Sequence, residues 1–179
     1  MLKTLRQIAS VGIVSEPPPP PDEDLRIRDS LQAHIRAVLG RALCIRHVDA
    51  GSCNGCELEI HALNNPLYNL EGLGIRFVAS PRHADLLLVT GPVSKHMEVA
   101  LRRAYEATPD PKVVVALGDC GCTGGIFGEN YASCGRVSNV LPVDVAVPGC
   151  PPSPTRILAG ILTAISNAPG KRPAPGDRP

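Results

Sequence analysis

The chain is organised around nine residues, Gly-Ser-Cys-Asn-Gly-Cys-Glu-Leu-Glu at positions 51–59, a turn that carries two thiols. A Cys-x-x-Cys pair in a turn can supply two ligands to a metal or two partners to a redox disulfide. Two further thiols stand far along the chain, Cys120 in Gly-Asp-Cys-Gly-Cys and Cys150 in Pro-Gly-Cys-Pro-Pro. Each of these three sites directly follows an apolar, β-branched run, so the placement of those runs determines where the thiols meet.

The three runs, at 44–49, 112–117 and 143–147, are predicted to be strands of one parallel sheet. In a parallel α/β sheet, residues just after a strand lie along the carboxyl edge, where ligands bind. Thiols far apart in sequence are therefore expected to converge on one crevice and to form a four-thiolate site. The cysteines concerned are Cys53, Cys56, Cys120 and Cys150.

The Cys-Pro step at 150–151 favours an iron–sulfur cluster, since bacterial ferredoxin ligand runs also end in Cys-Pro. A tetrathiolate zinc site more often pairs two Cys-x-x-Cys turns close together, and zinc and a disulfide stay open as alternatives. Of the other thiols, Cys44 lies within a strand and is interpreted as a small core hydrophobe. Cys122 and Cys134 lie in a glycine-rich stretch at 121–138 and compete for the fourth ligand position.

Composition narrows the class of protein. A chain of 179 residues with 44% hydrophobic content and a net charge of +1 is typical of one soluble domain. Aromatic residues make up only 3% and there is no Trp, which argues against nucleic acid as a partner. Seven cysteines without a recognisable secretory signal indicate a reducing, cytoplasmic compartment, where clustered thiols bind metal.

The domain organisation follows from proline and glycine content. Residues 1–26 are predicted to be an N-terminal extension with a proline-rich spacer, 27–168 an iron–sulfur α/β domain, and 169–179 a disordered tail. Within the extension, the first fifteen residues have the pattern of a short amphipathic helix, which is either a docking helix or a frayed terminus. Its apolar face consists of Leu2, Leu5, Ile8 and Ala9.

The rest of the chain alternates strands and helices, which predicts an α/β fold with a doubly wound parallel sheet. Further strands are expected at 75–79 and 85–90, and the stretch 121–138 is expected to be an irregular functional loop. Helices are expected at 27–39, from the cysteine turn to about residue 63, and from Pro154 onward behind a Ser153 cap. A further helix is expected at 94–107, with Val99, Leu101 and Tyr105 on its buried face.

Glu57 follows the second thiol, and His61 lies four residues later on the same helical face. One interpretation is a first-turn acid favoured by the helix dipole and paired with His61. The other is a proton-relay carboxylate beside a redox centre. Arg46, Arg82 and Arg136 are candidate cations for a negatively charged cluster. The chain has thiols for one cluster, so it is expected to act as a relay in a larger complex.

Taken together, the motifs resemble one family. They are the cysteine turn at 51–57, Ser-Pro-Arg-His-Ala-Asp at 80–85, Thr-Gly-Pro at 90–92, Gly-Asp-Cys at 118–120 and Pro-Gly-Cys-Pro-Pro at 148–152. The family comprises the small subunits of membrane-bound (group 4) NiFe hydrogenases and formate hydrogenlyases, together with the 20 kDa B subunits of NADH:quinone oxidoreductases. The resemblance runs from about residue 42 to 165.

This resemblance implies a flavodoxin-like fold and one 4Fe–4S cluster held by the four cysteines of the predicted site. It also implies a large catalytic subunit over the cluster, ferredoxin-like iron–sulfur partners, and membrane-arm subunits that would hold the chain on the inner face of the cell membrane. In the hydrogenases, the residue that matches Glu57 is associated with proton passage.

The spacing of the two cysteines in the turn differs between the two branches of the family. The quinone-linked B subunits usually carry adjacent cysteines where this chain has Cys53-x-x-Cys56, and the spaced pair favours the hydrogenase branch. A quinone-reducing B subunit of a complex I-like enzyme is the alternative. A structural zinc module without redox activity is the alternative from a different class.

Overall fold

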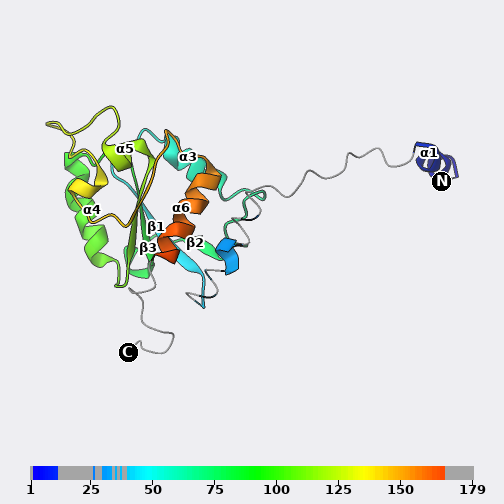
Figure 1. The fold of residues 1–179 in the computed structure, drawn as a ribbon, viewed down its shortest axis with the longest axis horizontal. Coiled ribbons are helices and arrows are strands. Elements are labelled where there is room, and N and C mark those ends of the chain that lie inside the picture. The colour runs from blue at the N-terminus through cyan, green and yellow to red at the C-terminus, as the bar shows by residue number, and fades with distance from the viewer. Residues whose placement is uncertain are drawn as a thin grey trace.

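The computed structural model describes residues 2–11, 26, 30–33, 35, 37 and 40–167. Its centre is one sheet of five strands in the order β2-β1-β3-β4-β5, and every neighbouring pair is parallel (Figure 1). The strands are β1 Leu43–Asp49, β2 Ile75–Phe77, β3 Leu86–Thr90, β4 Val113–Leu117 and β5 Val145–Val147. This order reverses direction beside β1, so the predicted flavodoxin-like, doubly wound α/β fold is confirmed.

Strands β3 and β4 are apolar except for Thr90 at the end of β3, because helices cover both faces of the sheet. All residues of β3 and β4 are buried. One face packs against α3 (Gly55–Ala62) and α6 (Pro154–Ser166), while the other packs against α4 (Lys95–Ala107) and the segments around α5 (Gly118–Thr123). Figure 1 shows α3 and α6 on one side of the sheet and α4 on the other.

Hydroxyl caps start two of these helices, and the sequence predicts the one at Ser153. The Ser153 Oγ accepts a hydrogen bond from the backbone N–H of Arg156 at 3.4 Å, and Pro154 takes the first helical position of α6. At the start of α4, the Ser94 Oγ accepts from the backbone N–H of Met97 at 3.3 Å. These caps fix where each helix begins relative to the strand before it.

The N-terminal region is described in part. Helix α1 spans Leu2–Val11, and Leu31 and Ile35 lie in helical backbone with their side chains buried. The proline spacer at 17–21, Val38 in the expected helix at 27–39, and the tail at 169–179 lie outside the described residues. The division into extension, domain and tail stays a prediction. Within the described part of the chain, every helix is too short or too polar to cross a membrane.

Several expectations for individual elements are wrong. Val99 is 56% exposed, because at 3.6 residues per turn it points away from Leu101, which is fully buried in α4. The stretch 121–138 is not wholly irregular, since it contains the end of α5 and a 3₁₀ turn at Val137–Asn139. Two strands are shorter than expected, since the second ends at Phe77 instead of residue 79 and the last begins at Val145 instead of residue 143.

Candidate functional site

Three loops bring four cysteines together at the carboxyl edge of the sheet. Cys53 and Cys56 follow β1, Cys120 lies in α5 directly after β4, and Cys150 follows β5. The thiols lie close enough that Cys53, Cys120 and Cys150 all raise the pKa of Cys56. Cys53 and Cys150 are exposed, whereas Cys56 and Cys120 are partly buried.

The turn before α3 is held by one carboxylate and one close backbone contact. The Asp49 Oδ1 accepts hydrogen bonds from the backbone N–H groups of Gly51 and Ser52, both at 2.8 Å. Asn54, in left-handed conformation at φ 71°, then turns the chain into α3. The turn after β3 presses against this loop, since a Cβ on Gly91 would lie 2.5 Å from the Ser52 nitrogen. Cys53 and Cys56 are thereby held from two neighbouring strands.

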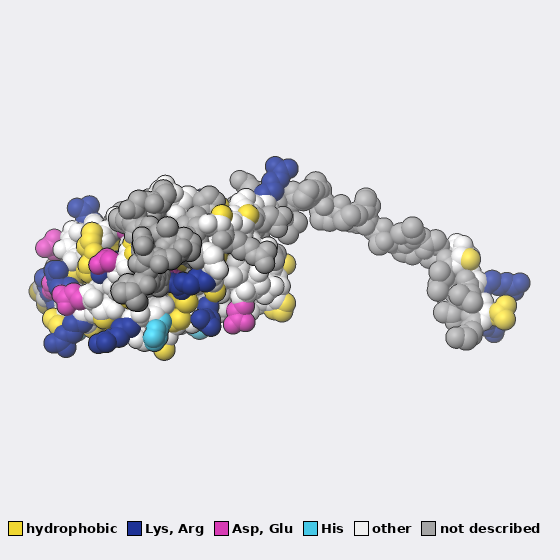
Figure 2. Space-filling view, turned by 90° about the horizontal axis from the view of Figure 1, so that it is seen from below, with side chains coloured by type: hydrophobic (Ala, Val, Ile, Leu, Met, Phe, Trp, Pro, Cys, Tyr) yellow, Lys and Arg dark blue, Asp and Glu magenta, His cyan; other side chains and the backbone are white. Residues whose placement is uncertain are grey.

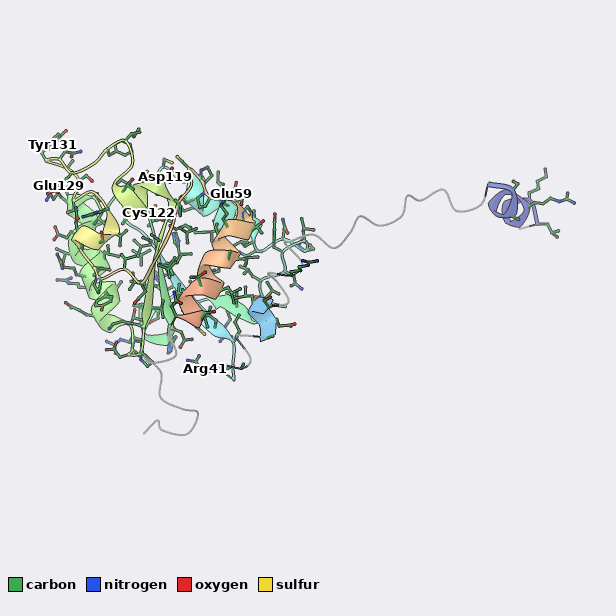
Figure 3. All side chains as sticks on the ribbon, in the orientation of Figure 1. Arg41, Glu59, Asp119, Cys122, Glu129 and Tyr131 are labelled. Carbon is green, nitrogen blue, oxygen red and sulfur yellow. The ribbon has the colours of Figure 1, made fainter. Side chains whose placement is uncertain are left out.

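Asp119 ties the loop of Cys120 to the loop of Cys150. Its backbone N–H donates to the Gly149 carbonyl at 2.8 Å, and its Oδ1 accepts from the Gly149 backbone N–H at 2.7 Å. Figure 3 shows Asp119 at the same edge of the molecule as α3 and α5. Sequence reasoning did not single out this residue, and its position between a strand end and a cysteine was the only signal.

Two glycines form a cradle for the thiols. A Cβ on Gly118 would lie 2.6 Å from the Cys56 Sγ, and a Cβ on Gly125 would lie 2.7 Å from the Cys120 Sγ. Both glycines also have positive φ, +82° and +56°, which other residues adopt at a cost. A side chain at either position would displace a thiol. The cradle therefore fits a group bound by these sulfurs.

Replacing Gly118 with alanine tests the cradle. Because the new methyl group would push the Cys56 sulfur away, we expect G118A to bind much less iron than the unaltered chain. Gly128 is the matched control, since its φ is +55° and nothing lies within 4 Å of a Cβ built on it. In both G118A and G128A, an alanine with positive φ costs about 1–2 kcal/mol of folding free energy, but only G118A disturbs a thiol. Equal iron content in the two purified variants would contradict the cradle.

The chemistry of the four thiols suits a cationic partner. Burial raises the pKa of Cys56 to about 12, and the Glu57 carboxylate and the neighbouring thiols add to that rise. Burial also raises the pKa of Cys120. Clustered thiolates repel one another unless a metal compensates their charge, so metal binding here releases protons. Among the described residues, no three His, Cys, Asp or Glu side chains are arranged to hold a single metal ion.

The three remaining thiols contact other parts of the domain. Cys44 is 4% exposed in β1, as its interpretation as a core residue requires. The Cys134 thiol donates to the Glu98 carboxylate at 3.4 Å, and the Cys122 thiol donates to the Ala116 carbonyl at 3.6 Å. Burial raises the pKa of Cys122 to about 11. Cys122 and Cys134 thus have hydrogen-bond partners outside the four-cysteine site.

Glu57 is a buried carboxylate at the start of α3. It is 7% exposed, and neither of its oxygens has a hydrogen-bond partner. The histidine beside it is His47 of β1, with 3.6 Å between His47 Nε2 and Glu57 Oε1, instead of the expected His61. His47 Nε2 also lies 2.9 Å from the Thr90 hydroxyl. Burial lowers the pKa of His47, and the nearby Glu57 charge opposes this shift.

A pocket of about 350 Å³ opens beside Glu57. Its polar lining includes Arg46, His47, His61 and Asn64, and Phe77 contributes to its apolar wall. The Nε of Arg46 is buried there without a hydrogen-bond partner. The other candidate cations, Arg82 and Arg136, are exposed. The pocket therefore connects exposed side chains, such as His61 and Asn64, with the buried Glu57 carboxylate, which follows Cys56 in the chain.

Comparison with known proteins agrees with this geometry. The family described as NADH ubiquinone oxidoreductase, 20 Kd subunit, matches residues 53–164. A probable membrane-bound hydrogenase subunit of Pyrococcus furiosus is 46% identical over 133 residues, which is 74% of this chain and 80% of that protein. Formate hydrogenlyase subunit 7 of Escherichia coli is 44% identical over 76% of this chain, and the match spans 53% of its length.

The quinone-linked branch is represented too. The B subunit of the NADH-quinone oxidoreductase of Desulfovibrio desulfuricans is 44% identical over 124 residues, 69% of this chain and 66% of that protein. A chain in the structure of a membrane-bound sulfane sulfur reductase, an archaeal respiratory membrane complex, superposes with a TM-score of 0.62 at 31% identity. That match covers 84% of this chain and 80% of the other. The chain therefore belongs to the family of NADH ubiquinone oxidoreductase 20 kDa subunits, and it is a subunit of an oxidoreductase complex.

Proposed function

We propose that this chain is the 4Fe–4S electron-transfer small subunit of a membrane-associated NiFe hydrogenase or formate hydrogenlyase-type complex. In this role it passes electrons to or from a large catalytic subunit. The observation that carries the proposal is the convergence of four cysteines from three loops at one sheet edge, beside glycines that leave no room for a side chain.

The ligands in this proposal are Cys53, Cys56, Cys120 and Cys150. A 4Fe–4S cluster bound to them supplies one-electron transfer at the carboxyl edge of the sheet. The chain's own contribution is placement: Asp119 holds the last two ligand loops together. The backbone N–H groups at the start of α3 favour negative charge next to the first two ligands.

Glu57 is proposed to relay protons beside this centre. Its carboxylate adjoins Cys56 in the chain, is buried without a hydrogen-bond partner, and borders the pocket lined by polar side chains. Burying a carboxylate without a hydrogen-bond partner costs free energy, and this cost supports a functional role for Glu57. His47 of β1 is the histidine nearest this carboxylate, with 3.6 Å between His47 Nε2 and Glu57 Oε1.

Exposed apolar side chains lie on elements that border the cysteines. Leu58 of α3 is 61% exposed, and Ile126, Phe127 and Tyr131 of the loop after α5 are 94%, 54% and 97% exposed. Figure 3 places Tyr131 on the loop that projects at the same end of the molecule as Asp119. Large exposed apolar groups near a functional site mark protein interfaces. We propose that the large catalytic subunit covers this surface, and that ferredoxin-like and membrane-arm subunits complete the complex.

A charge placed on this surface tests the interface. We expect Ile126→Asp to reduce copurification of the large subunit strongly, because a buried unpaired carboxylate is costly at an interface, while the chain keeps its iron. Val99→Asp is the matched control, since Val99 is a 56% exposed apolar residue on α4. If both variants copurified the large subunit equally well, the proposed surface would be wrong.

The metal content of the complex decides between the two branches of the family. We expect the complex purified anaerobically through this chain to contain iron together with stoichiometric nickel. Iron without nickel would contradict the hydrogenase assignment and favour the quinone-linked alternative, which the 44% identity to a quinone-linked B subunit supports as second candidate. Zinc alone would contradict both.

A further inference from the structure

Helix α1 carries a basic, amphipathic sequence that the proposed electron-transfer role does not use. Its ten residues are Leu-Lys-Thr-Leu-Arg-Gln-Ile-Ala-Ser-Val, and its only charged residues are Lys3 and Arg6. Helical spacing puts the apolar positions on one face, namely 2, 5, 8 and 9, and the polar positions 3, 6, 7 and 10 on the other. Leu2 is 83% exposed, and Lys3 and Arg6 are exposed as well.

Basic and hydrophobic side chains lie on the surface of α1 (Figure 2). An isolated helix of this length is marginal in water. Its amphipathic pattern therefore indicates that α1 is stabilised by binding to a surface that contacts both its apolar face and its positive charges.

The charge pattern of α1 differs from that of a helix built to pack on this protein. Helix α4 also exposes basic residues, including Lys95 and Arg103, but it mixes them with Glu98 and Glu106 and buries Leu101 against the sheet. Helix α1 has no acidic residue to pair with its two cations. Uniform positive charge beside an apolar face is the pattern of helices that lie in the interface of anionic membranes.

We propose that α1 is an in-plane membrane anchor, which places its apolar face among the acyl chains and Lys3 and Arg6 among anionic lipid headgroups. This goes beyond the proposed function, in which partner subunits alone hold the chain at the membrane. The contact is made by the chain itself and needs neither iron nor the large subunit. Its failure and the failure of the electron-transfer proposal are therefore separable.

The test measures binding of the purified full-length chain to vesicles by flotation. We expect it to float with vesicles of phosphatidylglycerol and phosphatidylcholine much more than with phosphatidylcholine alone, and to be released by high salt. Each cation near an anionic surface contributes about a fivefold gain in partitioning, so K3Q/R6Q should lower binding about thirtyfold. L5Q/I8Q, which keeps both charges, should also lose binding because it removes the apolar face.

The matched control removes the same charge from α4. K95Q/R103Q should change vesicle binding less than twofold, and the iron content of all three variants should equal that of the unaltered chain. Equal binding to both kinds of vesicle, or unchanged binding of K3Q/R6Q, would overturn the anchor. Loss of a partner subunit from the K3Q/R6Q complex with vesicle binding intact would also overturn it, and would show that α1 docks on protein.

Discussion

Serine in place of any one of Cys53, Cys56, Cys120 or Cys150 should abolish the visible absorption and the reduced-state paramagnetic signal of the proposed 4Fe–4S cluster. A cluster held by four thiolates from three loops loses a ligand that no neighbouring residue replaces, because the other thiols are engaged elsewhere. Turnover of the assembled complex should fall with the signal, since the electron path is interrupted. The measurement is iron content together with electron paramagnetic resonance of the anaerobically purified protein.

Cys44→Ser and Cys122→Ser are the matched controls, because each makes the same chemical change outside the proposed ligand set. Cys44 is buried in β1, so serine there should cost about 1–3 kcal/mol of stability while the iron content is retained. Cys122 should behave in the same way, since its thiol donates to the Ala116 carbonyl. A full cluster in Cys120→Ser together with loss of the cluster in Cys122→Ser would show that the ligand assignment is wrong.

Glu57→Gln should slow turnover of the complex by about 10²–10⁴-fold, the range that a positioned proton-transfer group contributes, while the cluster stays assembled. Glutamine keeps the shape of the side chain and its place 7% exposed at the start of α3, but it cannot carry a proton between donor and acceptor. The readouts are turnover, iron content and the cluster signal of the same preparation. The combination of slow turnover and full iron content separates a proton-relay role from a role in cluster assembly.

Glu59→Gln is the control, since it removes a carboxylate from the same helix two residues further on. Figure 3 shows Glu59 at the end of the molecule that carries α3, so the change is made close to the site. We expect its turnover to stay within about twofold of the unaltered complex, as is usual for surface changes. Unchanged turnover in Glu57→Gln would leave that residue only the stabilising effect of an acid near a helix start.

The sheet and the meeting of the cysteines are predictable because they rest on local signals. The runs at 86–89 and 113–117 are continuously apolar, as strands buried on both faces must be, and a glycine directly follows each of the two strands. Once parallel strands are assigned, the carboxyl edge follows from topology alone. The doubly wound arrangement then accounts for the order of the strands and for the side of the sheet that each helix covers.

Other features depend on contacts that sequence spacing does not encode. Helix α5 consists of Gly-Asp-Cys-Gly-Cys-Thr, residues of low helix propensity, and forms because the fold holds it between β4 and β5. His47 reaches Glu57 from a neighbouring strand, so the local i, i+4 pattern pointed to His61 instead. The hydrogen bonds between Asp119 and Gly149 join residues thirty apart in the chain. Val99 was assigned to the buried face together with Leu101 and Tyr105, but at 100° per residue it lies on the opposite side of the helix from Leu101.

The most direct test of the electron-transfer account is the iron, acid-labile sulfide and zinc content of the full-length chain, loaded with iron and sulfide under anaerobic conditions. The account predicts about four irons and four sulfides per chain and no zinc, as one 4Fe–4S cluster requires. One zinc per chain without sulfide would contradict it and make the four cysteines a structural tetrathiolate site.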